Sequence, residues 1–218
     1  MKIFRLNETA SVANHFLAEL RDVNIQGDSM RFRRNIERLG ELMAYEVSKD
    51  LPYVTKTVTT PLGTADIPVL EQQPIMMTVL RAGLPFYNGF MNIFDKASSG
   101  FIGAFRKENA DAPDGFEIEL GYAAYPDLEG QDLIIVDPML ATGRSLVDAI
   151  EKAIGKGTPR SIHIVATIAA PEGIAYVEEK MGDRCTLWLC AEDSHLNEKS
   201  YIIPGLGDAG DLAFGSKD

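Results

Sequence analysis

The sequence predicts an α/β protein whose mainly parallel sheet is flanked by helices, with a helical N-terminal segment and a β-hairpin arm in front of it. The first observation is that short apolar runs alternate with amphipathic stretches over residues 74–190. Such alternation needs crossover connections, which place helices over parallel strands. The second is the helical spacing of apolar residues before Pro52. The third is a β-branched run, a Pro-Leu-Gly turn and a second extended run, which together indicate a hairpin.

The N-terminal portion, residues 1–52, is expected to be helical. Apolar side chains recur every three or four positions over residues 16–20 and again over residues 36–47, as on one face of a helix. Pro52 ends this portion, because proline lacks the N–H group that would continue a helix. The hairpin arm is expected to pair residues 55–60 with residues 64–70.

The central portion, residues 74–190, is expected to hold the sheet. Its helical stretches carry apolar stripes, whereas its strands are short and almost wholly apolar, as strands buried on both faces are. Ligands on such sheets bind beyond the carboxyl ends of the strands, so the residues that follow each strand are the first candidates for a site. Strands are expected at residues 75–80, 100–105, 116–122, 133–136, 161–168 and 186–190, helices at residues 84–94, 146–154 and 174–181, and a polar loop at residues 107–115.

The charge balance restricts the possible partners. The formal net charge is −11, and nucleic-acid binding depends on clustered Lys and Arg that neutralise phosphates. We therefore expect no nucleic-acid partner, although a local basic pocket for a small phosphorylated metabolite remains compatible with this composition.

The apolar segments are too short for a membrane partner to be expected. No stretch approaches about 18 apolar residues, and the start of the chain has no apolar run typical of a secretory signal. The expected location is therefore cytoplasmic. Cys185 and Cys190 stand in an apolar run without further thiols for a zinc site, and we expect them to be core residues. His163 lies in a strand pattern and is expected to be packed in the core.

The sharpest local signal runs from Leu133 to Ser145. An apolar strand ends at Asp137, a short loop follows, and a helix opens at Thr-Gly-Arg-Ser. The free N–H groups and partial positive charge of a helix N-terminus favour an anion, and Gly143 lets the backbone approach it closely. With the hydroxyl groups of Thr142 and Ser145, the segment predicts a cradle for a terminal monophosphate, where Asp137 can hold ribose hydroxyls. The alternative is a plain capped helix after a strand.

This segment does not fit the phosphate loop of nucleoside triphosphatases. That loop requires a Gly five positions before Gly143 and a Lys directly after it. Pro138 and Arg144 occupy these two positions, so the interpretation as a triphosphatase fails.

Residues 137–145 resemble the motif that binds phosphoribosyl diphosphate (PRPP) in type I phosphoribosyltransferases, in the form D-P-M-L-A-T-G-G-S of the uracil-specific family. The resemblance to uracil phosphoribosyltransferases covers nearly the whole chain. It implies the type I phosphoribosyltransferase fold and a pentosyltransferase that converts uracil and PRPP to UMP and pyrophosphate in pyrimidine salvage. The other similar stretches are residues 31–34, 44–46, 79–84, 101–106, 169–174, 196–198 and 201–211.

The resemblance also implies roles for particular residues. Arg81 and Arg106 match arginines that contact the diphosphate, where cations can stabilise the charge of the leaving group. Asp208 matches a residue that reaches both PRPP and uracil, and with the two arginines it forms the expected catalytic set. The expected uracil contacts are Ile202, Gly207, Asp208 and Ala209. The expected PRPP contacts are Arg81, Arg106, Asp137, Pro138, Met139, Leu140, Ala141, Thr142, Gly143, Arg144, Ser145 and Asp208.

The chain departs from the uracil-specific form of this loop at one position, Arg144. Arg144 replaces a second glycine, and we expect that it does not block binding and either contacts the phosphate or points to solvent. Ala141 stands where related enzymes often carry a carboxylate, so a general base would have to be Asp208 or water. Mg²⁺ is the expected cofactor, bound through the PRPP diphosphate without direct protein ligands.

The organisation expected from the resemblance is a single domain over residues 1–218. Residues 1–52 form its helical N-terminal portion, residues 74–190 its α/β core and residues 191–218 a uracil-binding tail. A homodimer or a larger homo-oligomer is expected. Two alternatives are a phosphoribosyltransferase for another nucleobase and a non-catalytic regulator that senses nucleotides with the same fold.

Overall fold

The structure is a computed structural model that describes residues 1–108, 116–155 and 157–216, and the side chains of residues 1–103, 121–155 and 157–216. In this part of the chain, seven strands form one sheet in the order β1-β9-β8-β7-β4-β5-β6, and each neighbouring pair is parallel except β5 and β6. The predicted α/β class with a mainly parallel sheet is therefore confirmed. The strands are β1 (Lys2–Arg5), β4 (Ile75–Leu80), β5 (Ser98–Glu108), β6 (Phe116–Ala124), β7 (Asp132–Leu140), β8 (Ser161–Ala169) and β9 (Thr186–Glu192).

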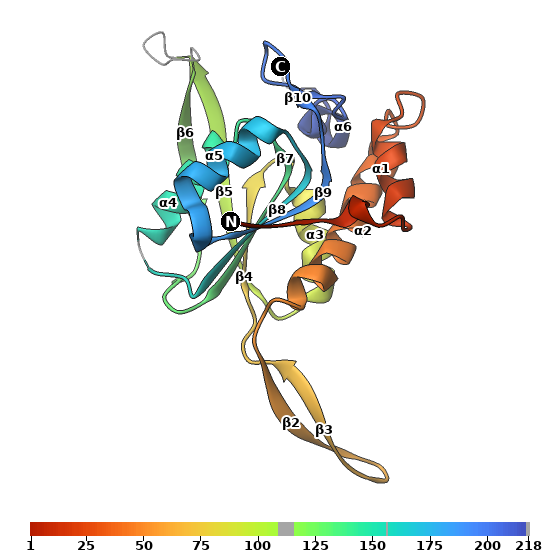
Figure 1. The fold of residues 1–218 in the computed structure, drawn as a ribbon, viewed down its shortest axis with the longest axis vertical. Coiled ribbons are helices and arrows are strands. Elements are labelled where there is room, and N and C mark those ends of the chain that lie inside the picture. The colour runs from red at the N-terminus through yellow and green to blue at the C-terminus, as the bar shows by residue number, and fades with distance from the viewer. Residues whose placement is uncertain (109–115, 156, 217–218) are drawn as a thin grey trace.

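Helices cover both faces of the sheet, and the main layers are visible in Figure 1. Side chains alternate between the faces of a strand, so Ile134 and Val136 of β7 pack with the helices on one face while Leu133 and Ile135 pack with those on the other. Because both faces are buried, the central strands are almost wholly apolar, as predicted. The first face carries α1 (Ala13–Arg21), α2 (Ser29–Ser48), α3 (Leu84–Ile93) and α6 (Ala209–Phe214), and the second carries α4 (Arg144–Ile154) and α5 (Pro171–Met181).

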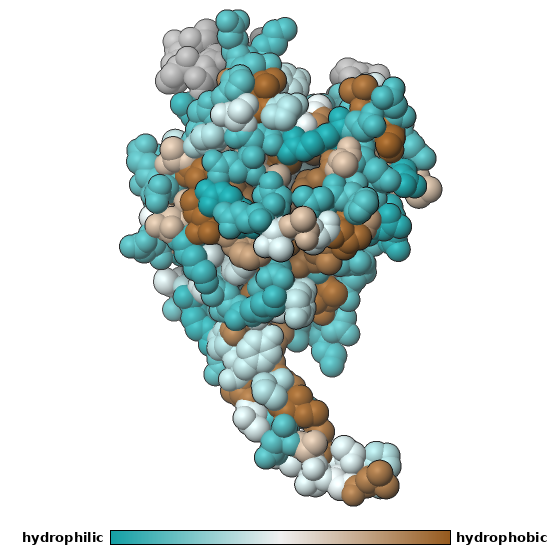
Figure 2. All heavy atoms as spheres, turned by 45° about the vertical axis from the view of Figure 1, so that its right-hand side comes forward, coloured by the Kyte–Doolittle hydropathy of each residue, from teal (hydrophilic) through white to brown (hydrophobic). Residues whose placement is uncertain are grey.

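The predicted hairpin is present as an arm that extends away from the body of the molecule (Figure 1). It consists of β2 (Tyr53–Thr60) and β3 (Gly63–Leu70), which pair antiparallel along their whole length. Several apolar side chains on the arm are exposed, including Val54, Leu62 and Ile67, and Figure 2 shows apolar surface along it.

The N-terminal portion is not wholly helical, contrary to the expectation for residues 1–52. Its first strand, β1, runs parallel to β9 at the edge of the sheet. The ring of Phe4 packs on that of Trp188, with 5.2 Å between the ring centroids. Four residues carry no periodicity that could reveal a strand, and only the free edge of β9 makes this one form.

The strand that was expected to end near Asp137 continues further. Met139 and Leu140 still pair with Ile168 and Ala169 of β8, so β7 ends at Leu140. Pro138, which has no N–H group to donate, does not take part in this pairing. The extension carries Asp137 and Met139 into the region of the site described below.

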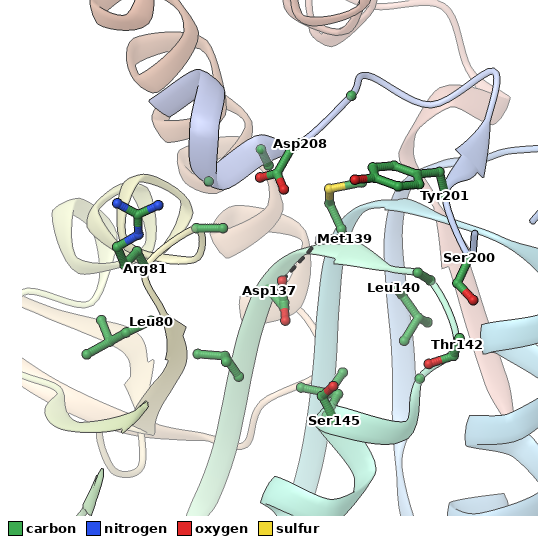
Figure 3. Close-up of a pocket in the computed structure, with 18 of the residues that line it drawn as sticks. Leu80, Arg81, Asp137, Met139, Leu140, Thr142, Ser145, Ser200, Tyr201 and Asp208 are labelled. Carbon is green, nitrogen blue, oxygen red and sulfur yellow. Dashed lines mark hydrogen bonds between the residues drawn. The ribbon is translucent and has the colours of Figure 1, made fainter. Parts of the chain in front are cut away.

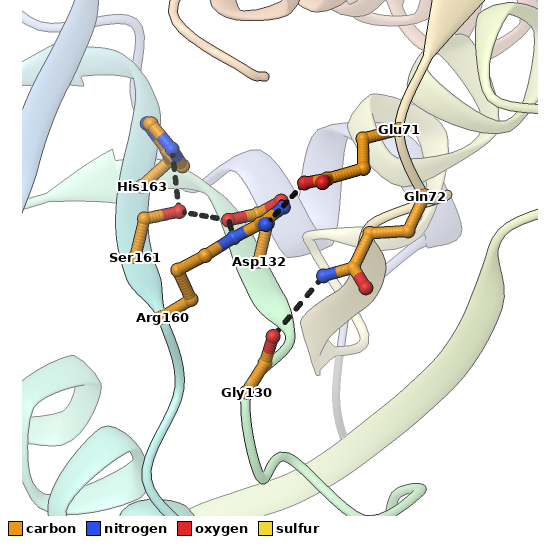
Figure 4. Close-up of polar contacts among 7 residues, drawn as sticks. All are labelled: Glu71, Gln72, Gly130, Asp132, Arg160, Ser161 and His163. Atoms are coloured by element: carbon orange, nitrogen blue, oxygen red, sulfur yellow. Dashed lines mark hydrogen bonds and ion pairs between the residues drawn. The ribbon is translucent and has the colours of Figure 1, made fainter. Parts of the chain in front are cut away.

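A polar network fastens the base of the arm to the sheet, at the end opposite the site (Figure 4). Arg160 bonds the buried Asp132 through two hydrogen bonds and also pairs with Glu71 at the end of β3. Although burial favours the neutral acid, the hydrogen bonds from Arg160 and Ser161 prevail and lower the pKa of Asp132. His163 is buried beside Ser161 and Trp188, and burial lowers its pKa, which agrees with its predicted place in the core.

The two cysteines are buried and not disulfide-bonded, as expected for core thiols. Burial raises the pKa of Cys185 to about 11 and that of Cys190 further still, so neither forms the reactive thiolate readily.

Candidate active site

A cavity of about 650 Å³ lies where β4 and β7 end and the C-terminal tail crosses over them (Figure 3). The end of β4 and the residues directly after it form one wall. The end of β7 and the start of α4 form the second wall, and the C-terminal tail forms the third. The cavity is therefore at the carboxyl ends of parallel strands, where ligands of such sheets bind. Its described lining residues are Val79, Leu80, Arg81, Ala82, Asp137, Met139, Leu140, Ala141, Thr142, Gly143, Ser145, Leu146, Lys199, Ser200, Tyr201, Gly207, Asp208, Ala209 and Gly210.

The N-terminus of α4 opens into this cavity. Gly143 precedes the helix with a φ of 76°, in the left-handed region that a side chain would disfavour. No side chain caps the helix, so its first N–H groups have no protein partner of that kind. Thr142 and Ser145 line the cavity on either side of Gly143. This geometry suits an anion at the helix N-terminus.

The loop before α4 is held in place by the start of α5. Gly173 packs so closely on it that a Cβ atom there would lie 2.3 Å from the carbonyl oxygen of Ala141. A Cβ atom at Gly143 would in turn approach the carbonyl oxygen of Gly173 to 3.0 Å. The stretch 169–174 resembles the family, but the sequence assigned no role to it. The structure shows that its Gly173 fixes the position of the loop before α4.

Asp137 lies under the cavity, half-buried, near the end of β7. Its Oδ1 accepts a hydrogen bond of 3.2 Å from the backbone N–H of Met139. Burial nevertheless dominates and raises the pKa of Asp137 to about 7. The carboxyl group thus exchanges its proton near neutrality, which is typical of groups at functional sites.

Among the side chains that the structure describes, two that were expected to contact PRPP do not line the cavity. Pro138 is buried within β7. Arg144 is exposed at the start of α4, and its guanidinium lies 6.0 Å from the ring centroid of Tyr176 on α5. The expectations that Arg144 contacts PRPP and does not block its binding stay predictions.

Arg81 follows β4 directly and lines the cavity. The Leu80–Arg81 peptide bond is cis. The guanidinium reaches α6, where its Nη2 lies 3.6 Å from Oδ1 of Asp211 and donates a hydrogen bond of 3.4 Å to the carbonyl oxygen of Gly215. The second expected cation, Arg106, belongs to β5, and its side chain lies outside the described residues.

The tail brings Gly207, Asp208 and Ala209 to the cavity, opposite the loop at Thr142. Asp208 caps α6, because its Oδ1 accepts a hydrogen bond of 3.0 Å from the N–H of Asp211. Ile202 differs from these three. It is only 3% exposed, packs in the core and does not line the cavity.

The tail turn depends on a network that the sequence did not reveal. Arg21 bonds both carboxylate oxygens of Asp193, at 2.9 and 2.6 Å, and also the carbonyl oxygen of Gly205. Asp193 in turn accepts the N–H of Gly205 at 2.9 Å. Gln26 adds a bond to the carbonyl oxygen of Leu206. The end of α1 and the loop that follows it therefore hold the tail turn, and 172 residues of sequence separate Arg21 from Asp193.

Three further lining residues, Lys199, Ser200 and Tyr201, received no role from the sequence. They form a turn between β10 (His195–Leu196) and β11 (Ile202–Ile203). Their side chains carry an ammonium, a hydroxyl and a phenol, but a short polar turn has no pattern that distinguishes a site from a surface loop.

No group of three or more His, Cys, Asp or Glu side chains among the described residues could hold a metal ion. None of the helices described is both long enough and apolar enough to span a bilayer.

Comparisons with known proteins point to one family. A family model described as uracil phosphoribosyltransferase matches residues 8–216. A uracil phosphoribosyltransferase from Porphyromonas gingivalis is 48% identical over 217 residues, which is 100% of each chain. Another from Pyrococcus furiosus is 39% identical over 202 residues, covering 91% of this chain and 84% of its own. The solved structure of the AQ2163 protein from Aquifex aeolicus matches 98% of both chains with a TM-score of 0.86 at 33% identity.

Proposed function

The chain belongs to the uracil phosphoribosyltransferase family, and we propose that its cavity transfers the phosphoribosyl group of PRPP to N1 of uracil. The observation that carries this proposal is that the loop at Thr142 and the turn at Asp208, which lie 66 residues apart by number, line one cavity. An anion-binding helix start and a glycine-rich tail turn can then act on the two halves of one product, UMP.

The reaction exchanges one bond at the anomeric carbon of the ribose. The bond from C1 to the diphosphate oxygen breaks, the bond from C1 to N1 of uracil forms, and the N1 proton is released. The transition state resembles an oxocarbenium ion while negative charge accumulates on the departing pyrophosphate. The protein accelerates this step by orienting both substrates and by placing fixed charges where charge develops.

The 5-phosphate is assigned to the start of α4. The start of that helix, which carries no side-chain cap, and the hydroxyl groups of Thr142 and Ser145 supply hydrogen-bond donors at the cavity. The ribose hydroxyls are assigned to Asp137, whose carboxylate can accept their hydrogen bonds. Met139, Leu140, Ala141 and Gly143 complete this contact through the loop.

The diphosphate is assigned to Arg81 and Arg106. Arg81 stands at the opposite end of the cavity from Thr142 in Figure 3, so a substrate with an anion at each end spans the space between them. A guanidinium forms strong, charge-assisted hydrogen bonds with phosphate oxygens.

Uracil is assigned to the tail turn at Gly207, Asp208 and Ala209, and the buried Ile202 is assigned to supporting this turn from the core. Peptide N–H and C=O groups can pair with the alternating acceptors and donor of the uracil edge. Cytosine exchanges an acceptor for a donor and would leave groups unpaired, at a cost of about 1–3 kcal/mol for each. The N1 proton is assigned to Asp208 or to water.

Mg²⁺ is assigned to the diphosphate of the substrate. Among the described lining residues only Asp137 and Asp208 carry carboxylates, and one oxygen of Asp208 already accepts a backbone hydrogen bond. This small number of protein oxygens agrees with an ion that is held mainly by phosphate oxygens and water. When bound, Mg²⁺ neutralises part of the charge on the leaving group.

The remaining assignments concern the whole chain. We take residues 1–218 as one domain with its tail as the uracil-binding portion, because the N-terminal helices and the tail share a hydrophobic cluster. A homodimer or larger homo-oligomer is supported by the exposed apolar side chains of the arm. The acidic charge supports an enzyme that has no nucleic-acid partner. Sedimentation of the full chain would determine the number of subunits.

One assay tests the function directly. Pyrophosphate release from PRPP and Mg²⁺ should depend on uracil, and should be far slower with cytosine, hypoxanthine, guanine, xanthine or orotate. Asp208→Asn should lower kcat strongly while the protein stays folded, because Asn also caps helices. Asp66→Asn on the arm is the matched control. Release with another base but not with uracil would overturn the assignment, and so would binding of uracil and PRPP without any product.

A further inference from the structure

We propose that Lys199 is a further substrate-binding residue, whose ammonium group pairs with the monophosphate end of PRPP and of UMP. This rests on the proposed function, which places the 5-phosphate at the start of α4. Neither the sequence pattern nor the family resemblance assigned a role to this lysine.

The charges around the cavity call for a second cation. PRPP carries a phosphate at one end and a diphosphate at the other, yet the described lining residues include only two cations, Arg81 and Lys199. They also include two carboxylates, Asp137 and Asp208, and the whole chain has a net charge of −11. Without a cation near each anionic group, the field of this protein would oppose binding.

The two cations come from opposite walls of the cavity. Arg81 follows β4, whereas Lys199 belongs to the tail turn directly before Ser200. In Figure 3, Ser200 lies on the same side of the cavity as Thr142, and Arg81 lies on the other side. Lys199 directly precedes Ser200 and lines the same cavity, so we assign its ammonium group to the end proposed for the monophosphate.

The loop at Thr142 does not supply this cation itself. Its own basic residue, Arg144, is directed toward the ring of Tyr176 and does not line the cavity. In the described part of the chain, no acidic side chain pairs with the Lys199 ammonium. The four-carbon stem of an exposed lysine lets the charge follow a phosphate over several ångströms.

Hydrogen bonds to Asn197 fix the backbone of the turn that carries Lys199. The side chain of Asn197 accepts the N–H groups of Lys199 at 2.9 Å and of Tyr201 at 3.0 Å, and its backbone bonds Tyr201 and Ser200 as well. Ser200 has a φ of 61°, and no other residue except glycine has a positive φ among those described. Such conformations persist where surrounding bonds enforce them, and they often mark functional sites.

The experiment compares ligands that carry only one of the two anionic ends. UMP carries the monophosphate and pyrophosphate represents the other end. Lys199→Met should weaken UMP binding about tenfold, as expected for one charged hydrogen bond, and should raise the KM for PRPP. The inhibition constant of pyrophosphate should change less than twofold. Lys199→Arg should retain most of the UMP affinity, because it keeps the charge.

The controls separate this proposal from the function on which it rests. Lys180→Met removes a lysine on α5 that pairs with Glu179 and should leave both affinities unchanged. Unfolding temperatures show whether each variant is folded. If the wild type is active but Lys199→Met binds UMP as tightly as the wild type, the role of Lys199 is overturned and the proposed function stands. The same holds if Lys199→Met loses UMP affinity and pyrophosphate affinity equally. A wild type that does not use uracil overturns the proposed function instead.

Discussion

Nη2 of Arg81 lies 3.6 Å from Oδ1 of Asp211, a buried oxygen that accepts no hydrogen bond from the described residues. The pair joins the end of β4 to α6, the helix that Asp208 caps. If Arg81 binds the diphosphate, that ligand must compete with Asp211 for the guanidinium. Helix α6 therefore links the cavity ends that we assign to pyrophosphate and to uracil.

Removing the charge of Asp211 should strengthen pyrophosphate binding. Asp211→Asn frees the guanidinium and removes a nearby negative charge, so we expect the inhibition constant of pyrophosphate to fall about threefold to tenfold. The measurement is product inhibition at fixed uracil. Asp183→Asn, which removes a fully exposed carboxylate, is the control. Weaker inhibition in Asp211→Asn would mean that Asp211 supports the diphosphate-binding form of Arg81.

Removing the guanidinium of Arg81 should lower kcat/KM for PRPP strongly and change the KM for uracil little. We expect Arg81→Ala to lower kcat/KM for PRPP by about 100-fold or more, because a charged donor to the leaving group is lost. The KM for uracil should change little. Initial rates with each substrate varied in turn provide the test. Arg34→Ala removes an exposed arginine of α2 and should behave like the wild type.

The raised pKa of Asp137 predicts a pH-dependent stability difference. The folded chain keeps the proton of Asp137 up to about pH 7, whereas the unfolded chain releases it near pH 4. Ionisation therefore destabilises the folded state as the pH rises through this interval. Asp137→Asn avoids that penalty. The difference in unfolding temperature, variant minus wild type, should therefore become more positive as the pH rises from 5 to 8. Asp95→Asn, at an exposed position, is the comparison.

The same variant should bind PRPP less well, because an amide replaces the carboxylate assigned to the ribose hydroxyls. A constant difference in unfolding temperature across this pH range would show that Asp137 is ionised at all these values.

Breaking the Arg21–Asp193 pair should loosen the tail turn. The side chain of Asp193 is 4% exposed and that of Arg21 is 24% exposed, so we expect Asp193→Asn to lower the free energy of unfolding by about 3 kcal/mol. The turn at Gly205 loses its anchor at the same time, and the KM for uracil should rise more than that for PRPP. Glu46→Gln breaks an exposed pair with Lys49 and should cost less than about 1 kcal/mol. Equal changes in both KM values would argue against a selective effect on the tail.

Adding a methyl group at Gly173 should displace the anion-binding loop. In Gly173→Ala the new Cβ would stand 2.3 Å from the carbonyl oxygen of Ala141, so the loop has to move. We expect a large rise in the KM for PRPP and in the dissociation constant of UMP. Gly27→Ala is the matched control, since a Cβ atom there meets no atom within 4 Å. Unchanged UMP binding in Gly173→Ala would show that the loop tolerates the shift.

The sequence by itself determined the fold class and the family. Alternating apolar strands and amphipathic helices are local patterns, so the parallel sheet, the helices on both faces and the hairpin arm were predicted close to their observed bounds. The segment from Asp137 to Ser145 is also local: a strand, a loop and a helix start that are continuous in sequence. Such features are readable because neighbouring residues in the chain are neighbours in space.

Only the tertiary structure decided which distant residues share the cavity and what holds them there. Lys199 lines it while Arg144 does not, and Arg21 secures a turn 184 residues away at Gly205. β1 likewise exists because β9 offers it an edge. These outcomes depend on contacts between segments far apart in the chain, where neither periodicity nor spacing indicates which side chains meet, and packing of the whole core sets their positions.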